Sequence, residues 1–414
     1  MNTEIITIGD ELLIGQITDT NSKWIAAIAS ENGFQINRIT SIPDKLETII
    51  NTLNDAASRS ELVFITGGLG PTNDDVTRRA ISEFFQTDYK LNQHVYEDIR
   101  QFLQKRGIEM GELNQEQAKV PEKASVYYNT IGTAPGMKLI KNNTIYVFMP
   151  GVQFEMKEMM KHSIIPELKK QFIKKEYNYK IVITQGIPEA YLADKLKDWE
   201  NRLPDDIKVA YLPSAGIVKL RISNASESIQ NTEKKINKEI EKLKEIIPEY
   251  YVATSKLPLE AIIGETLKND HSTISTAESC TGGKIASKIT SIAGSSDYFK
   301  GSVIAYSNEV KENMLGVSPE TILEFGAVSK EVVEEMVKGA RKLFDSDYAI
   351  SISGIAGPTG GTKEKPVGTT WIAVCDDESV ISEKYLFGNK RDVNIEKASN
   401  TAIGMMRKLI LNKG

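Results

Sequence analysis

The sequence has few of the residues that most often build catalytic and metal sites. Its 414 residues include two cysteines, Cys280 and Cys375, and three histidines, His94, His162 and His271. Two cysteines cannot form a disulfide framework or a cysteine-based zinc site by themselves. None of the histidines lies in a recognisable motif, so neither a Ser-His-Asp triad nor a histidine-rich metal site is expected. A nucleophile in this chain therefore needs a base other than histidine.

Long apolar runs and an excess of basic residues are also lacking. The sequence has no stretch of about 18 apolar residues that could cross a membrane, and no basic segment followed by an apolar one that would mark a signal peptide. The 51 basic and 56 acidic residues give a net charge of −5, whereas nucleic-acid-binding proteins are usually basic. We therefore expect a cytoplasmic protein that contacts neither membranes nor nucleic acid directly.

The length predicts two or three domains. In residues 1–172, apolar strand-like runs alternate with amphipathic helix-like segments, a pattern typical of a mostly parallel α/β domain. The expected strands are 5–8, 34–42, 61–66 and 144–149, and the expected helices are 21–31, 43–58, 75–85 and 94–106.

Two further domains are expected after residue 172. Residues 173–252 predict a small α+β module in the order β-α-β-β-α, with strands 180–185, 208–211 and 217–222 and helices 189–200 and 228–246. Residues 253–414 return to the α/β pattern. Their expected strands are 272–277, part of 298–306, 348–353 and 368–375, and their expected helices are 282–289, 308–315, 330–344 and 397–411.

Two loops carry most of the functional signal. Gly67–Asp75 and Thr276–Lys284 each follow an apolar strand-like run and open a helical pattern. Strand-to-helix turns of this kind hold anionic ligands in open α/β sheets, because backbone N–H groups point out of the helix start. The sequence therefore predicts two sites on two domains.

In the front loop, Gly67, Gly68 and Gly70 let the backbone pass close to a ligand. Thr72, with Asp75 three residues later, has the form of a capping box, so a helix start that could bind a phosphate is expected. The loop matches neither the P-loop nor the dinucleotide-binding pattern. A tight turn before a capped helix, with no ligand, accounts for it equally well.

Carboxylates beside this loop predict a divalent cation such as Mg²⁺. Asp74 and Asp75 would repel a bare phosphate, and Asp10, at the end of the first strand, adds further oxygen ligands. The segment that starts with Gly132 and Thr133 offers a second loop of small residues near the ligand.

The front motifs together resemble the competence/damage-inducible protein A (CinA) family. They are Gly9–Leu13, Asp19–Asn21, Gly67–Thr77, Gly132–Met137 and Met149–Val152. The resemblance implies a molybdopterin-binding-like α/β fold and metal-dependent ADP-ribose pyrophosphatase activity. It also implies that Asp10, Asp74, Asp75 and Thr77 form the metal and pyrophosphate region, beside a substrate region of Gly67, Gly68, Gly70, Thr72, Gly132 and Thr133.

In the back loop, Ser279 is a candidate nucleophile at an exposed turn, although a serine there is also a common helix N-cap. Cys280 is a rival nucleophile, but no histidine lies nearby in sequence to activate it, so we expect it to be a small buried residue. If Asn308 caps the next helix, Lys311 lies three residues inside it, where the macrodipole and burial both favour the neutral amine. A neutral lysine can act as the base for a serine. The alternative, an ordinary solvated lysine with no role in catalysis, is the one that the sequence alone favours.

The back motifs resemble the nicotinamide-nucleotide amidase (NMN deamidase) domain, the C-terminal half of the same family. They are Thr276–Gly283, Tyr306–Lys311, Ser353–Pro358 and Pro366–Thr369. The resemblance implies that nicotinamide mononucleotide (NMN) is hydrolysed to nicotinate mononucleotide and ammonia without a cofactor. It makes Ser279 the nucleophile, Lys311 the base and Tyr306 an assisting hydroxyl, with substrate contacts at Thr281, Gly282, Gly283, Ser353, Gly354 and Gly357.

One departure from the family pattern concerns the phosphate. Where relatives carry Gly-Asp-Arg and then a second arginine, this chain has Gly388–Asp392, and Asn394 stands in the place of the second arginine. Arg391 is the first candidate for binding the substrate phosphate and Lys390 the second.

The middle module resembles a KH-type fold but lacks the Gly-x-x-Gly clamp that nucleic-acid-binding KH domains need. We expect it to space the outer domains and to support a homodimer. Two alternatives remain at this point: a pterin-binding enzyme of cofactor biosynthesis, and a non-catalytic competence factor associated with DNA.

Overall fold

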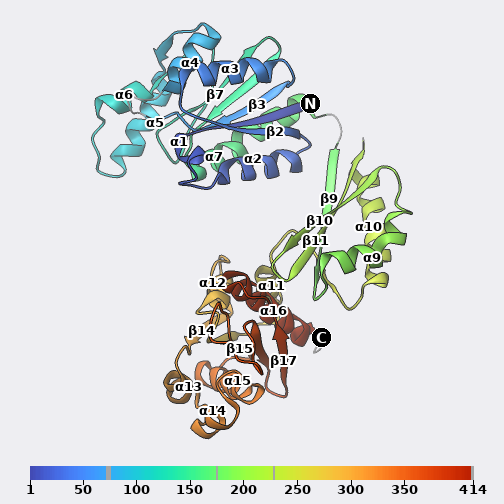
Figure 1. The fold of residues 1–414 in the computed structure, drawn as a ribbon. Coiled ribbons are helices and arrows are strands. Elements are labelled where there is room, and N and C mark those ends of the chain that lie inside the picture. The colour runs from blue at the N-terminus through green and yellow to red at the C-terminus, as the bar shows by residue number, and fades with distance from the viewer. Residues whose placement is uncertain (71–75, 174–175, 227–228, 412–414) are drawn as a thin grey trace. The chain divides into compact units, whose positions relative to one another are not determined.

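The computed structural model describes residues 1–70, 76–173, 176–226 and 229–411. They divide into two compact units (Figure 1). The first is formed mainly by Met1–Asn178, and the second by Tyr179–Asn224 together with Glu233–Gly414. Across the described ranges, none of the helices is both long and apolar enough to cross a membrane.

The N-terminal unit is built on a six-stranded sheet in the order β2-β1-β3-β8-β7-β6. The first four strands of that order run parallel, and β7 and β6 are antiparallel to their neighbours. The sheet strands are β1 (Asn2–Ile8), β2 (Gln35–Ile42), β3 (Leu62–Thr66), β6 (Ser125–Tyr127), β7 (Gly136–Lys141) and β8 (Thr144–Met149), and a separate two-stranded ladder joins β4 (Tyr89–Leu91) to β5 (Lys119–Pro121).

Helices cover both faces of this sheet (Figure 1). One face carries α3 (Leu46–Ala57), α4 (Val76–Phe85) and α5 (Gln93–Gln104), and the other carries α2 (Thr20–Glu31), α7 (Gln153–Met159) and α8 (Ile165–Phe172). Short α1 (Asp10–Leu13), α6 (Glu112–Gln117) and a π-helical turn at Met160–Ile164 complete the unit. All five residues of β3 are buried, which explains why its sequence is a continuous run and not an alternating one.

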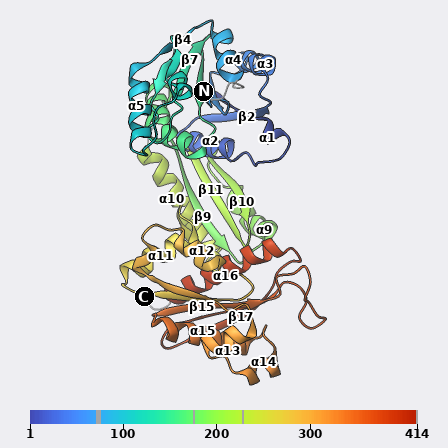
Figure 2. The same cartoon turned by 90° about the vertical axis from the view of Figure 1, so that its left-hand side faces the viewer.

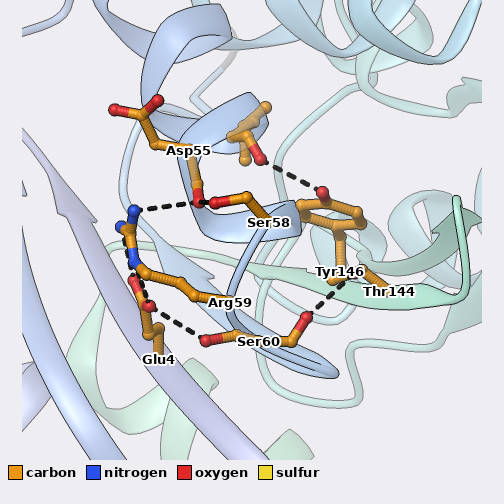
Figure 3. Close-up of polar contacts among 8 residues, drawn as sticks. Glu4, Asp55, Ser58, Arg59, Ser60, Thr144 and Tyr146 are labelled. Carbon is orange, nitrogen blue, oxygen red and sulfur yellow. Dashed lines mark hydrogen bonds and ion pairs between the residues drawn. The ribbon is translucent and has the colours of Figure 1, made fainter.

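An ion pair between the buried Glu4 and the partly exposed Arg59 joins β1 to the segment after α3 (Figure 3). Glu4 is 2% exposed, and its carboxylate accepts hydrogen bonds from Arg59 Nε at 2.5 Å and Nη2 at 2.9 Å, and from Ser60 Oγ at 2.9 Å. Thr144 donates to the carbonyl of Ser60 at 2.9 Å, which extends the contact to β8. Charge-assisted forked bonds of this kind are strong, and removing one partner leaves a buried charge.

Replacing Arg59 by alanine is therefore expected to lower the free energy of unfolding by about 3 kcal/mol, because the Glu4 carboxylate stays buried without its cation. Urea unfolding at neutral pH measures the change. The matched control is Arg79→Ala, which breaks a pair with Glu83 whose side chains are 70% and 45% exposed. That control should cost less than about 1 kcal/mol. Equal losses for the two variants would contradict the role assigned to Arg59.

The middle module is a four-stranded sheet in the order β10-β11-β9-β12. One face packs on two helices through buried residues such as Leu196, Trp199 and Ile240. Its elements are β9 (Glu176–Gln185), α9 (Glu189–Glu200), β10 (Ile207–Ser214), β11 (Ile217–Ser226), α10 (Ile229–Ile246) and β12 (Tyr251–Thr254). The expected order β-α-β-β-α thus gains a final strand, β12, which was not predicted.

The other face of this module packs on the C-terminal domain, so the two form one unit. Gln185 Nε2 donates to the carbonyl of Asn400 at 2.7 Å, and Asn400 Nδ2 donates to the carbonyl of Ala215 at 2.8 Å. Arg407 donates to the carbonyl of Val252. A Cβ at Gly404 would fall 1.8 Å from Gln185 Oε1, so the Gln185 side chain lies against α16 in this position only because the residue is glycine.

The C-terminal domain has a five-stranded sheet in the order β14-β13-β15-β16-β17, parallel across the first three strands and antiparallel across the last two. Figure 2 shows the sheet between α16 on one face and α13 to α15 on the other. The strands are β13 (Ile274–Glu278), β14 (Phe299–Ile304), β15 (Tyr348–Gly354), β16 (Thr369–Cys375) and β17 (Val380–Leu386). The helices are α11 (Leu259–Asn269), α12 (Lys284–Thr290), α13 (Asn308–Leu315), α14 (Pro319–Phe325), α15 (Lys330–Phe344) and α16 (Arg391–Leu411), with a 3₁₀ turn at Ser295–Asp297.

The α/β fold class and the N-terminal, KH-type and C-terminal architecture agree with the sequence prediction. Several elements were missed, namely β4 to β7, β17, α1, α6 to α8, α11 and α14. Helix α16 begins at Arg391, six residues before the predicted start at Lys397. This difference places the basic candidates for phosphate binding at a helix start and not in a loop.

Candidate functional site

Ser279 lies at the turn from β13 to α12, where its motif predicts it. Its backbone N–H donates to the carbonyl of Ile352 on the neighbouring strand at 3.0 Å, and the residue is 9% exposed. The turn contains two successive glycines with positive φ, Gly282 at 60° and Gly283 at 95°. The position of Ser279 is therefore fixed by a hydrogen bond to the neighbouring strand and by a turn whose positive φ angles residues other than glycine rarely adopt.

Lys311 reaches Ser279 from α13. Its Nζ donates to Ser279 Oγ at 3.3 Å and to the carbonyl of Ala305 at 2.8 Å. The residue is only 1% exposed. Burial lowers the pKa of the Lys311 ammonium below its ordinary value, and the nearby Cys280 thiol opposes that shift only in part. The arrangement supplies a serine with a lysine that is easily deprotonated.

The cap of α13 differs from the expectation. Ser307, and not Asn308, is the N-cap, since its hydroxyl accepts from the N–H of Val310 at 3.3 Å. Lys311 is therefore one residue deeper in the helix than predicted. The lowered pKa of Lys311 has burial as its main cause.

Tyr306 and Arg391 contact one another, and the charge of Arg391 acts on Cys280 beside Ser279. Arg391 Nη2 donates to the Tyr306 hydroxyl at 3.1 Å, and Nη1 donates to the carbonyl of Gly357 at 2.9 Å. Tyr306 is 62% exposed, so a ligand can reach both groups. Within the described part of the chain, Lys390 forms no ion pair and no side-chain contact that would bring it to this site.

Several predicted substrate contacts are already used inside the protein. The hydroxyl of Thr281 and the N–H of Gly283 both donate to the Glu278 carboxylate, at 2.7 and 3.1 Å. The N–H of Gly282 donates to the carbonyl of Ser279 at 3.2 Å. These polar groups therefore shape the turn, and contact with substrate would have to come through other atoms of these residues.

The predicted contacts in the motif Ser353–Pro358 are also largely used inside the protein. The Ser353 hydroxyl donates to the carbonyl of Ala327 at 2.7 Å, and the residue is 1% exposed. A Cβ at Gly354 would lie 2.7 Å from Thr370 Oγ1. Gly357 has a φ of 87° and presents its carbonyl to Arg391. Of the three predicted positions, only Gly357 contacts another candidate residue.

Asn394 and Cys280 have structural explanations. Asn394 Nδ2 donates to the carbonyls of Ala356 and Gly388, at 3.0 and 2.8 Å, so it joins two loops from a buried position. Burial raises the pKa of the Cys280 thiol to about 12. A thiol that resists ionisation is a poor nucleophile, which agrees with the reading of Cys280 as a small buried residue.

At the front site, two glycines are required by close contacts. A Cβ at Gly67 would lie 2.1 Å from the carbonyl oxygen of Ile8, and one at Gly68 would lie 2.0 Å from Thr77 Oγ1. Both have positive φ, 103° and 65°. Thr77 is fully buried in α4. Gly70 is partly exposed at the end of the described loop, and Thr72, Asp74 and Asp75 lie outside the described residues.

A pocket of about 250 Å³ lies at the ends of β1 and β3. Sequence reasoning missed one of its residues, Asp44, whose carboxylate oxygen is 3.2 Å from the Cβ position of Gly68. Burial, together with the charges of Asp10 and Glu11, raises the pKa of Asp44. The pocket is lined by polar and small residues that include Glu11, Asp19, Asn21, Asp44, Gly67 and Gly68.

The second loop of the front site is packed against a buried acid. A Cβ at Gly132 would fall 2.2 Å from the carboxyl carbon of Glu155. The Oε2 atom of Glu155 accepts a hydrogen bond from Asn129 Nδ2 at 2.6 Å. Burial raises the pKa of Glu155. Thr133 is partly exposed beside it. Neither residue lines the pocket at β1 and β3.

The described residues do not by themselves form the metal site that the sequence predicts. Over residues 1–70, 76–173, 176–226 and 229–411, no three histidine, cysteine or carboxylate side chains lie close enough together to hold a metal ion. Asp10 and Asp44 repel one another, which a cation would relieve. Asp74 and Asp75 are outside these ranges.

Three family models match successive parts of the chain. The probable molybdopterin binding domain matches residues 4–170, the damage-inducible protein CinA KH domain matches 179–253, and the CinA C-terminal domain matches 256–410.

Similar proteins match over nearly the full length. A CinA-like protein from Cytophaga hutchinsonii is 41% identical over 412 residues, and one from Flavobacterium psychrophilum is 42% identical over 415 residues; each alignment covers 99% of both chains. A solved structure, the competence/damage inducible protein CihA from Agrobacterium tumefaciens, is 36% identical and covers 37% of this chain and 98% of its own, with a TM-score of 0.36. The chain therefore belongs to the CinA family, with a molybdopterin-binding-like domain, a KH module and a CinA C-terminal domain.

Proposed function

We propose that the C-terminal domain is a nicotinamide-nucleotide amidase that hydrolyses NMN to nicotinate mononucleotide and ammonia. The observation that carries this proposal is the buried amine of Lys311, 3.3 Å from Ser279 Oγ. Burial lowers the pKa of Lys311. A serine paired with a neutral lysine is an established arrangement for amide hydrolysis.

The first step forms an ester with Ser279. The Oγ attacks the carboxamide carbon while Lys311 Nζ takes its proton. Collapse of the tetrahedral intermediate breaks the C–N bond, and the same proton passes from Lys311 to the leaving nitrogen, which departs as ammonia. The amine is then neutral again, as the second step requires.

The second step hydrolyses the ester. Lys311 takes a proton from water, the hydroxide attacks the acyl carbon, and Ser279 leaves with the proton returned to its Oγ. The products are the free enzyme and a carboxylic acid, which releases its proton to the solvent and becomes a carboxylate. Lys311 carries every proton that moves to or from Ser279 and the attacking water, so this half-reaction needs neither histidine nor a metal ion.

Arg391 and Tyr306 supply polar groups for the nucleotide. The Arg391 guanidinium donates to the Tyr306 hydroxyl and to the carbonyl of Gly357, and these two bonds fix its position. A forked cation matches the geometry of a phosphate. Arg391 is therefore preferred over Lys390 as the phosphate ligand.

A second activity, metal-dependent hydrolysis of ADP-ribose, is proposed for the N-terminal domain. The observation that favours it is the acidic pocket at the glycine loop, where the charges of Asp10 and Glu11 help to raise the pKa of Asp44. A bound Mg²⁺ would neutralise the pyrophosphate oxygens and activate water. Asp10 and Asp44, with Asp74 and Asp75, are the candidate ligands, and Gly67 and Gly68 allow close approach of the substrate.

One assay tests both activities. Purified protein is incubated with NMN or ADP-ribose, with and without EDTA, and ammonia and AMP are measured. Ammonia release from NMN should survive chelation, whereas AMP release from ADP-ribose should stop and return with added Mg²⁺. Loss of ammonia release on chelation would contradict the proposed amidase mechanism.

The two alternative functions predict different results. A pterin-binding enzyme should bind a molybdopterin precursor more tightly than ADP-ribose in a competition experiment. A DNA-associated factor should bind duplex DNA at micromolar protein, with an affinity that falls steeply as salt is raised.

A further inference from the structure

The end of β13 carries a buried carboxylate that the proposed reaction does not use. Glu278 directly precedes Ser279 and is 0% exposed. Its backbone lies between Ile304 of β14 and Ile352 of β15 in the sheet. A charged side chain at such a position is costly unless hydrogen bonds compensate the lost water.

Four donors from the following turn meet this carboxylate. Oε2 accepts from the Thr281 hydroxyl at 2.7 Å and from the N–H groups of Gly283 and Ile285 at 3.1 and 3.0 Å. Oε1 accepts from the N–H of Ala286 at 2.8 Å. Three of the four N–H groups at the start of α12 are thus satisfied by Glu278, while that of Lys284 donates to the carbonyl of Thr281 at 3.2 Å. The N-cap residue Gly283 has no side chain that could take this role.

We propose that Glu278 is the positioning residue that holds Ser279 in reach of Lys311. Glu278 fixes both ends of the turn from Ser279 to Gly283. It directly precedes Ser279 in the chain, and its carboxylate accepts a hydrogen bond from the N–H of Gly283. The N–H of Ser279 adds a bond to Ile352. With both ends fixed, the Oγ can move little, and a misplacement of about 1 Å can cost about 10²-fold in rate.

The same contacts determine where the substrate phosphate does not bind. N–H groups at a helix start are ordinarily available to an anion, but here the protein's own carboxylate takes them. A second anion at this turn would be repelled by Glu278. The N–H groups of this turn are therefore not the site of the substrate phosphate, and Arg391 remains its candidate ligand.

Two substitutions separate positioning from simple stability. In Glu278→Gln, the amide oxygen can replace Oε2 and keep three bonds, but the amide nitrogen then faces the N–H of Ala286, donor against donor. In Glu278→Asp, the charge is kept and the side chain is one methylene shorter, so it cannot reach all four donors. Both variants should fold, and both should lower kcat about 10- to 100-fold with little change in KM.

The matched control is Glu239→Gln in the KH module. Glu239 is 4% exposed and accepts from Trp199 Nε1 at 3.2 Å, so it is also a buried glutamate with an N–H donor. It lies outside the C-terminal domain. Its substitution should leave kcat unchanged even if the melting temperature falls.

Because the proposal rests on the proposed amidase function, its test has a second readout that needs no nucleotide. A fluorophosphonate probe that esterifies Ser279 with loss of fluoride reports the reactivity of the nucleophile. Labelling of folded Glu278→Gln and Glu278→Asp should slow in proportion to kcat, whereas Glu239→Gln should label at the wild-type rate. Wild-type labelling rates in both Glu278 variants would overturn the positioning role. Rapid labelling of the wild type with no ammonia release from NMN would instead overturn the proposed substrate and leave the role of Glu278 tested by labelling alone.

Discussion

Replacing Ser279 by alanine is expected to abolish ammonia release from NMN, with kcat lowered by a factor on the order of 10⁴ or more. The reason is that the proposed ester intermediate forms on Ser279 Oγ. Among the described residues, this is the nucleophile that contacts the Lys311 amine, at 3.3 Å. Single losses in a catalytic unit cost nearly as much as removing the whole unit. The double variant Ser279→Ala/Lys311→Met should therefore be no slower than Ser279→Ala alone.

The neighbouring cysteine provides the control for this prediction. Cys280→Ala should retain most of the activity, since burial raises the pKa of the Cys280 thiol to about 12 and keeps it protonated. Steady-state ammonia release, measured for both variants at equal folded concentration, decides between the two nucleophiles. Strong loss in Cys280→Ala with activity kept in Ser279→Ala would reverse the assignment.

Replacing Lys311 is expected to remove the base and to reveal the cost of burying it. Lys311→Met keeps the length and apolar body of the side chain, and kcat should fall about 10³-fold or more. Burial lowers the pKa of Lys311, so the unfolded chain binds the proton more tightly than the folded protein does. At pH values below the folded-state pKa the buried charge destabilises the fold in full, and this cost falls as pH rises through that pKa. Lys311→Met should consequently melt at the same temperature as the wild type or higher at neutral pH.

The pH profile gives an independent check of the base. In the wild type, kcat/KM should rise with pH through the lowered pKa of Lys311 and level off below pH 10.5, the ordinary value for a lysine. Lys311→Arg should be inactive at every pH, because a guanidinium does not lose its proton in this range. A wild-type profile that is flat from pH 5 to 10 would argue against a lysine base.

The sequence predicted helices and strands best where a strand is buried on both faces or where a helix is capped by the residues next to it in the chain. The run Leu62–Thr66 is buried throughout and was predicted as a strand. Helices α13 and α15 were predicted at their observed bounds; serines cap both starts, and Gly316 and Asp345, both with positive φ, follow the ends. Strand β17 was missed because it lies at the sheet edge, where none of its residues is fully buried and its charged residues are exposed.

The candidate site depends on contacts that a pattern cannot supply. Lys311 follows Ser279 by 32 residues, and only the parallel pairing of β13 with β14 brings their side chains together. The burial that lowers the pKa of Lys311 arises from that packing. Glu278 stood in the recognised motif, but its role could not be seen because three of its four partners are backbone N–H groups. Asp44 was missed for a similar reason, since it follows β2 and not either of the glycine loops.

The junction at Gly404 limits how this protein can be divided. Helix α16 starts at Arg391 beside the proposed amidase site, and 13 residues later it packs on Gln185 of the KH module. Cutting the chain near residue 255 would leave the carbonyl of Asn400 and the side chain of Arg407 without their partners and would expose the buried Met405 and Ile403 nearby. Residues 179–411 keep all of these contacts, so we expect this piece to be more stable than one that begins near residue 255.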